Sequence, residues 1–266
     1  MLLQSMFAYN LLRMIIIIVD CSHFLFGGWK KGHMLRGNVS EQIFMDRRLW
    51  IYTPPSYKES WSAFPVVYVQ DGCDLFCAGT NSLDTMEQWM SESKLKEVIL
   101  VGIESAQRND DYTPWPAPAL TERFNDFGGK GDRYLSFIVH DLKPYIDAEY
   151  NTDSSFTGTA IMGASLGGLI SIYAAYLYPQ VFGAIGAISA SFWYEGFMPF
   201  MGKADQYSPD QKIYMYVGTA EGIYKTNIQR HMVENTRKAF ELLRTKKCSI
   251  SHVKLFRSRQ CEPSNN

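Results

Sequence analysis

The sequence predicts an α/β protein whose mainly parallel sheet is flanked by helices. Short apolar segments alternate with amphipathic ones along the 266 residues. Two of the short segments, 64–69 (FPVVYV) and 98–103 (VILVGI), are apolar throughout, which is typical of strands buried on both faces. A glycine-flanked serine lies between another such segment and a helical one. These observations favour a single α/β domain.

The expected elements begin after residue 37. An antiparallel pair of strands is predicted within 42–52, and Pro54 and Pro55 end it because proline cannot continue a ladder. A central strand is expected at 64–69. The remaining predicted elements, in chain order, are a helix at 82–92, a strand at 98–103, a long irregular segment, a helix at 134–146, a strand at 157–162, a helix at 169–177, strands at 182–189 and 212–217, a helix at 227–245 and a strand at 249–256.

Composition limits the classes of partner. Basic and acidic residues number 26 and 27, so no bulk charge attracts nucleic acid or a membrane surface. Five cysteines are unevenly spaced, and Cys73 and Cys77 have no second pair or histidine couple to complete a zinc site. We expect free thiols in a reducing compartment, a cytoplasmic location, and a site without metal or cofactor.

The amino terminus differs from the rest of the chain. Residues 14–19 (MIIIIV) are very apolar, but Asp20 interrupts a segment too short to span a bilayer. We expect residues 1–33 to be an extension outside a domain at 34–266. A secretory signal and a membrane-surface anchor are the alternatives.

The stretch around Ser165 carries the clearest chemical signal. It reads Gly163-Ala164-Ser165-Leu166-Gly167, the G-x-S-x-G pattern of a nucleophile on a sharp strand-to-helix turn. Such a turn crowds the positions two before and two after the serine, so only very small residues fit there. The pattern predicts that Ser165 is a nucleophile; the alternative is a glycine-rich turn with an incidental serine.

Further segments carry a family resemblance. They are 52–57 (YTPPSY), 69–72 (VQDG), 112–116 (YTPWP), 128–134 (GGKGDRY), 189–193 (SASFW) and 217–222 (VGTAEG). With the serine motif, this set in this order resembles the "putative esterase" branch of the α/β-hydrolases, the esterase D-like and siderophore trilactone esterase group. The resemblance implies an α/β-hydrolase fold and a serine esterase that forms an acyl-enzyme with a small-molecule carboxylic ester. An acyltransferase on the same fold, or a catalytically impaired relic, is the alternative.

The resemblance also assigns roles. The backbone N–H of Leu166 and a second N–H from Cys73 or Gly72 would form the oxyanion hole. Glu221, which follows a late strand, would be the triad acid. For residues 70–72 the alternative is an ordinary strand-ending turn. For Glu221 the alternative is a solvated loop glutamate.

The histidine departs from the family pattern. These hydrolases place it after the last strand, in the order serine, acid, histidine. Here no histidine follows His252, which falls before or within the final predicted strand. His252 is therefore the candidate base that chain order supplies, and we expect a truncated or frame-shifted carboxyl terminus. His140 and His231 are expected to be surface or core residues.

Aromatic and basic residues are candidates for binding the substrate. Trp115 lies in the irregular segment 110–133, and Trp193 follows the strand after the nucleophile. Such side chains suit an aromatic acyl group, and Arg133 would attract an anionic one. The alternative is packing within an ordered loop.

Overall fold

The computed structural model describes residues 35–76, 82–122, 125–204, 208–245 and, by backbone, 249–256. These residues form an eight-stranded sheet in the order β1-β2-β4-β3-β7-β8-β9-β10, with β1 and β2 antiparallel at one edge and a parallel ladder from β4 to β10. The bounds are β1 Asn38–Phe44, β2 Arg47–Thr53, β3 Val66–Gln70, β4 Ile99–Ile103, β7 Thr159–Ala164, β8 Ala184–Ile188, β9 Lys212–Gly218 and β10 Ser249–Phe256.

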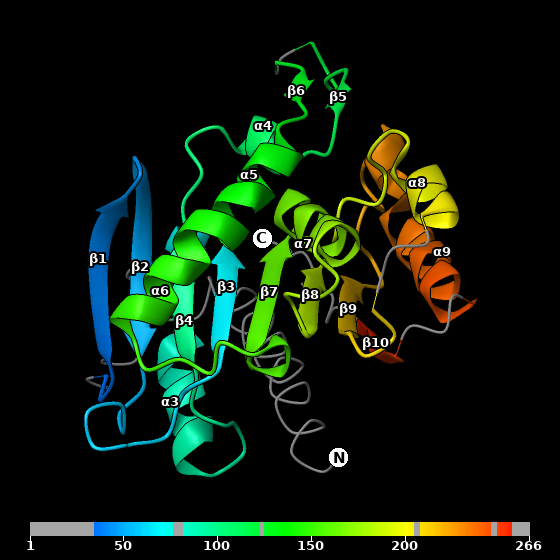
Figure 1. The fold of residues 1–266 in the computed structure, drawn as a ribbon. Helices are drawn as coiled ribbons and strands as arrows, with labels where there is room; N and C mark the ends of the chain where they lie inside the picture. The colour runs from blue at the N-terminus through cyan, green and yellow to red at the C-terminus, as the bar shows by residue number, and fades with distance from the viewer. Residues whose placement is uncertain (1–34, 77–81, 123–124, 205–207, 246–248, 257–266) are drawn as a thin grey trace, which may run out of the picture.

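The central strands are buried on both faces because helices cover each side of the sheet. Every residue of β3, β4 and β8 is buried. Two core clusters lie on opposite faces of the sheet (Figure 1). In one, alternate strand residues pack against the continuous run α5–η1–α6 and against α7 and α9. In the other, the intervening strand residues pack against α3. The bounds are α3 Ser82–Ser91, α5 Gly131–Phe137, η1 Ile138–Leu142, α6 Lys143–Glu149, α7 Leu166–Leu177, α8 Phe197–Lys203 and α9 Met232–Thr245.

The predicted α/β class and mainly parallel sheet are confirmed. The early antiparallel pair is a hairpin whose turn residues, Met45 and Asp46, have φ values of 45° and 63°. The predicted helix at 134–146 is part of the longer run from α5 to α6, which a π-helical turn at η1 interrupts. The predicted helix at 227–245 begins with a short 3-10 turn, η3 (Ile228–His231), before α9.

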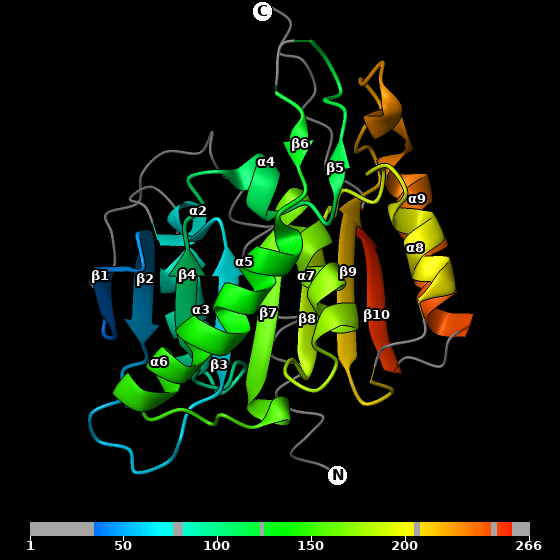
Figure 2. The same cartoon turned by 45° about the horizontal axis from the view of Figure 1, so that its top comes forward.

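The long segment after β4 rises above the carboxyl ends of the parallel strands (Figure 2). It contains α4 (Arg108–Asp111) and a small hairpin of β5 (Pro116–Ala117) and β6 (Phe127–Gly128). A short helix, α2 (Gly72–Phe76), follows β3 at the same edge. Ligands in open parallel sheets bind beyond the carboxyl ends of the strands, so these segments surround the expected location of a site.

Two further expectations concern the amino terminus and the cysteines. The proposed extension at 1–33 lies wholly outside them, and no helix in the described part of the chain is long and apolar enough to cross a bilayer. The expectation of free thiols is wrong for Cys73, which is disulfide-bonded. Sequence spacing could not reveal this, because disulfide formation depends on the distance between cysteines in space.

Candidate active site

Ser165 occupies the turn between β7 and α7. Its φ of 55° and ψ of −119° put a non-glycine residue in a strained backbone region. A Cβ added to Gly163 would lie 2.7 Å from Gln70 Cβ, and one added to Gly167 would lie 2.9 Å from the same atom. The crowding expected at both flanking positions is therefore present, and it comes from the end of the neighbouring strand β3.

The first turn of α7 provides donors beside the serine. Helix bonding starts with the Leu169 N–H, which donates to the Ser165 carbonyl at 3.0 Å. The amides at the start of a helix have no intrahelical acceptor, and the helix dipole favours negative charge there. The Leu166 N–H is therefore one of the free donors in this first turn and stays a candidate for the oxyanion hole.

The turn after β3 lies next to the elbow. β3 pairs with β7 in parallel, so residues 71–73 and Ser165 leave the sheet at adjacent positions. Asp71 has a φ of 54°, and Gly72 packs so closely on Gly102 that an added Cβ would approach its Cα to 2.6 Å. The close packing of Gly72 on Gly102 thus restricts the backbone of this turn beside Ser165. The N–H groups of Gly72 and Cys73 remain candidates for the second oxyanion donor.

A cavity of about 280 Å³ opens beside Ser165. Ser165 and Leu166 form part of its wall, and two aromatic side chains that line it, Phe127 and Trp193, contact one another with ring centroids 6.1 Å apart. Its polar lining includes Arg108, Asn227 and Gln229. The cavity brings the Ser165 side chain, aromatic surface and the Arg108 guanidinium together.

The three predicted substrate-binding residues lie in different environments. Trp193 lines the cavity. Trp115 instead packs among Tyr194, Phe197 and Phe200 and donates its Nε1–H to the Glu195 carbonyl at 2.8 Å. Arg133 is exposed on α5, and neither it nor Trp115 is among the residues that line the cavity.

Glu221 lies in the loop that follows β9, at the same edge of the sheet as Ser165. Its Oε1 accepts a hydrogen bond from Ser189 Oγ at 2.5 Å and another from the Gly218 N–H at 2.9 Å. The side chain is half-buried. The carboxylate is therefore held in one orientation by two donors from neighbouring strand ends.

The backbone of His252 lies within β10. It pairs with Tyr214 of β9. Tyr214 pairs in turn with Gly186 of β8, and Gly186 pairs with Met162 of β7. Three strand spacings of about 4.8 Å separate β10 from β7, or about 14 Å across the sheet. The register therefore does not support direct contact between His252 and Ser165.

The other two described histidines also have partners elsewhere. His140 stacks edge-on against Tyr178, and the Nδ1 of His231 lies 3.1 Å from Glu234 Oε2. Neither lines the cavity. Among the described residues, no group of three or more His, Cys, Asp or Glu side chains could hold a metal ion.

Sequence reasoning missed several residues at the site. Ser191 Oγ lies 3.2 Å from Ser165 Oγ, and Arg108 pairs with Asp71 at 2.9 Å. Arg108 also donates to the carbonyl of Ala164, the residue before Ser165, at 3.4 Å. The segment 189–193 was singled out for its resemblance, but only the fold reveals that Ser191 contacts Ser165.

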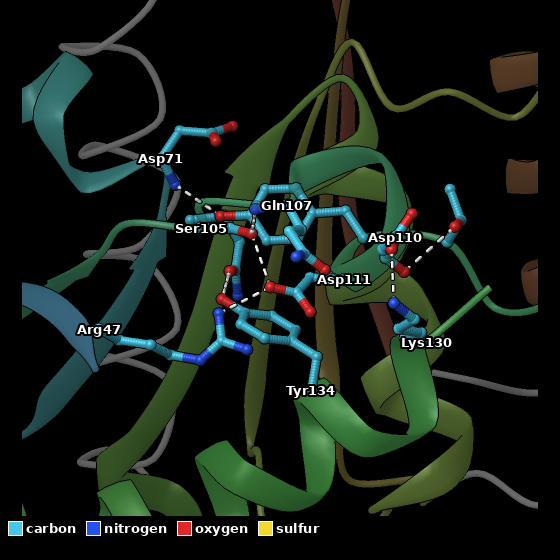
Figure 3. A network of polar contacts seen from close by, with 11 residues as sticks. Arg47, Asp71, Ser105, Gln107, Asp110, Asp111, Lys130 and Tyr134 are labelled. Carbon is cyan, nitrogen blue, oxygen red and sulfur yellow. Dashed lines mark hydrogen bonds and ion pairs between the residues drawn. The ribbon is translucent and has the colours of Figure 1, made fainter. Parts of the chain in front are cut away.

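A polar network fixes the segment above the sheet (Figure 3). Asp111 accepts from Arg47 Nη1 and Ser105 Oγ, each at 2.6 Å, and Lys130 Nζ lies 2.7 Å from Asp110 Oδ2. The Tyr134 hydroxyl donates to Gln70 Oε1, and burial raises the pKa of Tyr134 well above its usual value. Because this hydroxyl stays protonated, it can anchor the end of β3 beside the elbow.

Comparison with known proteins identifies the family of the chain. The family model described as "Putative esterase" matches residues 40–258. The Bacillus subtilis (strain 168) protein YbbA is 41% identical over 212 residues, which cover 80% of this chain and 84% of that one.

A siderophore enterobactin esterase of Emericella nidulans is 29% identical over 141 residues, covering 48% of this chain and 46% of that protein. The match thus spans about half of that relative. Among solved structures, an IroE-like serine hydrolase from Shewanella oneidensis has a TM-score of 0.71 at 21% identity, covering 84% of this chain and 74% of that one.

Proposed function

The chain belongs to the "Putative esterase" family and has the α/β-hydrolase fold, and from that premise we propose that it hydrolyses carboxylic esters through an acyl-enzyme on Ser165. The observation that carries the proposal is the position of Ser165. It lies in a strained turn between β7 and α7 and opens onto a cavity. Its hydroxyl can therefore approach a carbonyl carbon held in that cavity.

In the proposed reaction, Ser165 Oγ bonds to the ester carbonyl carbon and loses its proton to a base. The carbonyl oxygen becomes an oxyanion that accepts hydrogen bonds from the Leu166 N–H and from an N–H of Cys73 or Gly72. Collapse of this intermediate expels the alcohol, which takes up a proton. Water then attacks the acyl-enzyme and releases the carboxylic acid.

Glu221 is the proposed acid of the site. With Oε1 held by Ser189 and Gly218, its second carboxylate oxygen remains to orient and stabilise a protonated base. Chain order proposes His252 as that base, and the register of β10 argues against it. We therefore leave the base unassigned and test His252 directly.

The proposed substrate is a small or siderophore-type ester with an aromatic or apolar acyl group. Phe127 and Trp193 offer ring faces, and Arg108 offers a positive charge. At about 280 Å³, the cavity is at the lower end of the range for drug-sized ligands, so it would hold one acyl arm of a larger ester. The siderophore esterases among the relatives support this class without specifying the ester.

Burst kinetics test the proposal. With p-nitrophenyl acetate or benzoate, we expect a rapid release of nitrophenolate followed by slower turnover, and an acylated peptide containing Ser165 after acid quench. Ester products formed with an added alcohol would indicate acyl transfer instead. If the folded protein releases nitrophenolate no faster than Ser165→Ala, the proposal is wrong.

A further inference from the structure

We infer that Ser191 is a positioning residue for the nucleophile, held in place by a turn that also holds the proposed acid. The inference deepens the proposed function and rests on it. The turn comprises residues 189–191, between β8 and α8, and it contacts Ser165 on one side and Glu221 on the other.

The segment that includes this turn contacts Ser165 at three atoms. The Ser165 N–H donates to the Ile188 carbonyl at 2.9 Å, and the Ser165 carbonyl accepts from the Ser191 N–H at 3.1 Å. The third contact joins the two hydroxyl oxygens at 3.2 Å. Two backbone bonds therefore support the strained backbone of the nucleophile, and one side-chain bond acts on its reactive atom.

The burial of the two serines indicates the direction of the hydroxyl bond. Ser191 has no exposed surface. Within the described residues, its hydroxyl forms a hydrogen bond with Ser165 Oγ. A buried donor without an acceptor is costly, so the Ser191 hydroxyl donates. Ser165 is only half-buried and lines the cavity. Its own hydrogen is thereby left to face the cavity, where a base or water can accept it.

Ser189, two residues before Ser191, holds the turn in place. Ser189 has a φ of 45°, its N–H donates to the Tyr216 carbonyl at 2.7 Å, and its Oγ donates to Glu221 at 2.5 Å. Strained conformations persist where surrounding contacts over-determine them. The turn is therefore anchored to the end of β9 and to the acid loop, and Ser191 has little freedom to move away from Ser165.

Labelling kinetics with a fluorophosphonate test the inference. The reaction joins Ser165 Oγ to phosphorus and releases fluoride, while the serine proton passes to a base or water. For Ser191→Ala we expect the maximal labelling rate, kinact, to fall about three- to tenfold, the effect of one hydrogen bond. We expect KI to stay unchanged, because Ser191 does not line the cavity.

Ser171→Ala is the matched control. Ser171 is equally buried, lies in α7, and donates its hydroxyl to the Gly167 carbonyl at 2.7 Å without contacting Ser165. If Ser191 had only a structural role, Ser191→Ala and Ser171→Ala would both have a lower melting temperature, and their kinact values would be the same. Equal kinact for Ser191→Ala and wild type, or an equal fall in both variants, would overturn the inference. Absence of labelling in the wild type would overturn the proposed function and this inference with it.

Discussion

His252 of β10 pairs with Tyr214 of β9, which places its backbone level with Met162, three residues before Ser165. Strand β10 is the third strand from β7, and β8 and β9 lie between them, each hydrogen-bonded to a parallel strand on either side. A general base must come within about 3 Å of the proton it removes, or reach it through one water. The ladder therefore separates the backbone of position 252 from Ser165.

The first prediction concerns His252. Substitution His252→Gln is expected to leave the rate of fluorophosphonate labelling within about twofold of wild type, because the backbone register keeps position 252 away from Ser165. Labelling rates of the two proteins at neutral pH provide the measurement. A fall of a hundredfold or more would identify His252 as the base and contradict the separation inferred from the ladder.

The second prediction concerns the crowded elbow. In Gly167→Ala, the new Cβ would lie 2.9 Å from Gln70 Cβ, so either the β3 end or the elbow must shift. Overpacking of this kind costs about 1–3 kcal/mol of unfolding free energy. We expect urea unfolding to show that loss, and labelling of Ser165 to fall at least tenfold because the serine is displaced.

Gly202→Ala is the control for the elbow. An added Cβ at Gly202 in α8 meets nothing within 4 Å, and alanine favours helix more than glycine does. This variant should therefore be as stable as wild type or slightly more stable, with unchanged labelling. Equal losses in the two variants would show that the elbow is no more sensitive to added volume than an open helix position.

The third prediction concerns Tyr194 and alkaline pH. Burial raises the pKa of Tyr194 to about 12, and its hydroxyl donates to the Trp115 carbonyl. An unfolded tyrosine ionises near pH 10. The stabilising contribution of Tyr194 is therefore complete below about pH 10, declines as the pH rises from 10 towards 12, and is lost above 12.

Tyr194→Phe tests this pH dependence. At pH 8 the variant should be less stable than wild type by about 1 kcal/mol, the effect of one hydrogen bond. The difference should shrink between pH 10 and 12, because phenylalanine does not ionise. Urea unfolding at pH 8, 10 and 11 measures both effects, and a difference that stays constant with pH would contradict the raised pKa.

The sequence predicted the parts of this structure that local patterns determine. Strands such as β3 and β4 are apolar at every position, so their burial on both faces could be expected. The elbow was equally clear, because Gly163 and Gly167 flank Ser165 at the spacing that a crowded turn requires.

Contacts between distant segments could not be predicted in the same way. Ser191 lies 26 residues from Ser165, and their hydroxyls meet only because β7 and β8 are parallel neighbours. The contacts of Trp115 with Phe197 and Phe200 of α8 could not be predicted either, because they depend on where the segment after β4 folds. The hydrogen bond from Ser189 to Glu221 likewise depends on the pairing of β8 with β9.

The most direct test of the account is the intact mass of the folded protein after incubation with a fluorophosphonate, with Ser165→Ala as the control. We expect a single adduct on the wild type, located on the peptide that contains Ser165, and no adduct on the variant. A folded wild-type protein without an adduct, or an adduct that persists in Ser165→Ala, would contradict the claim that Ser165 is the nucleophile of this esterase.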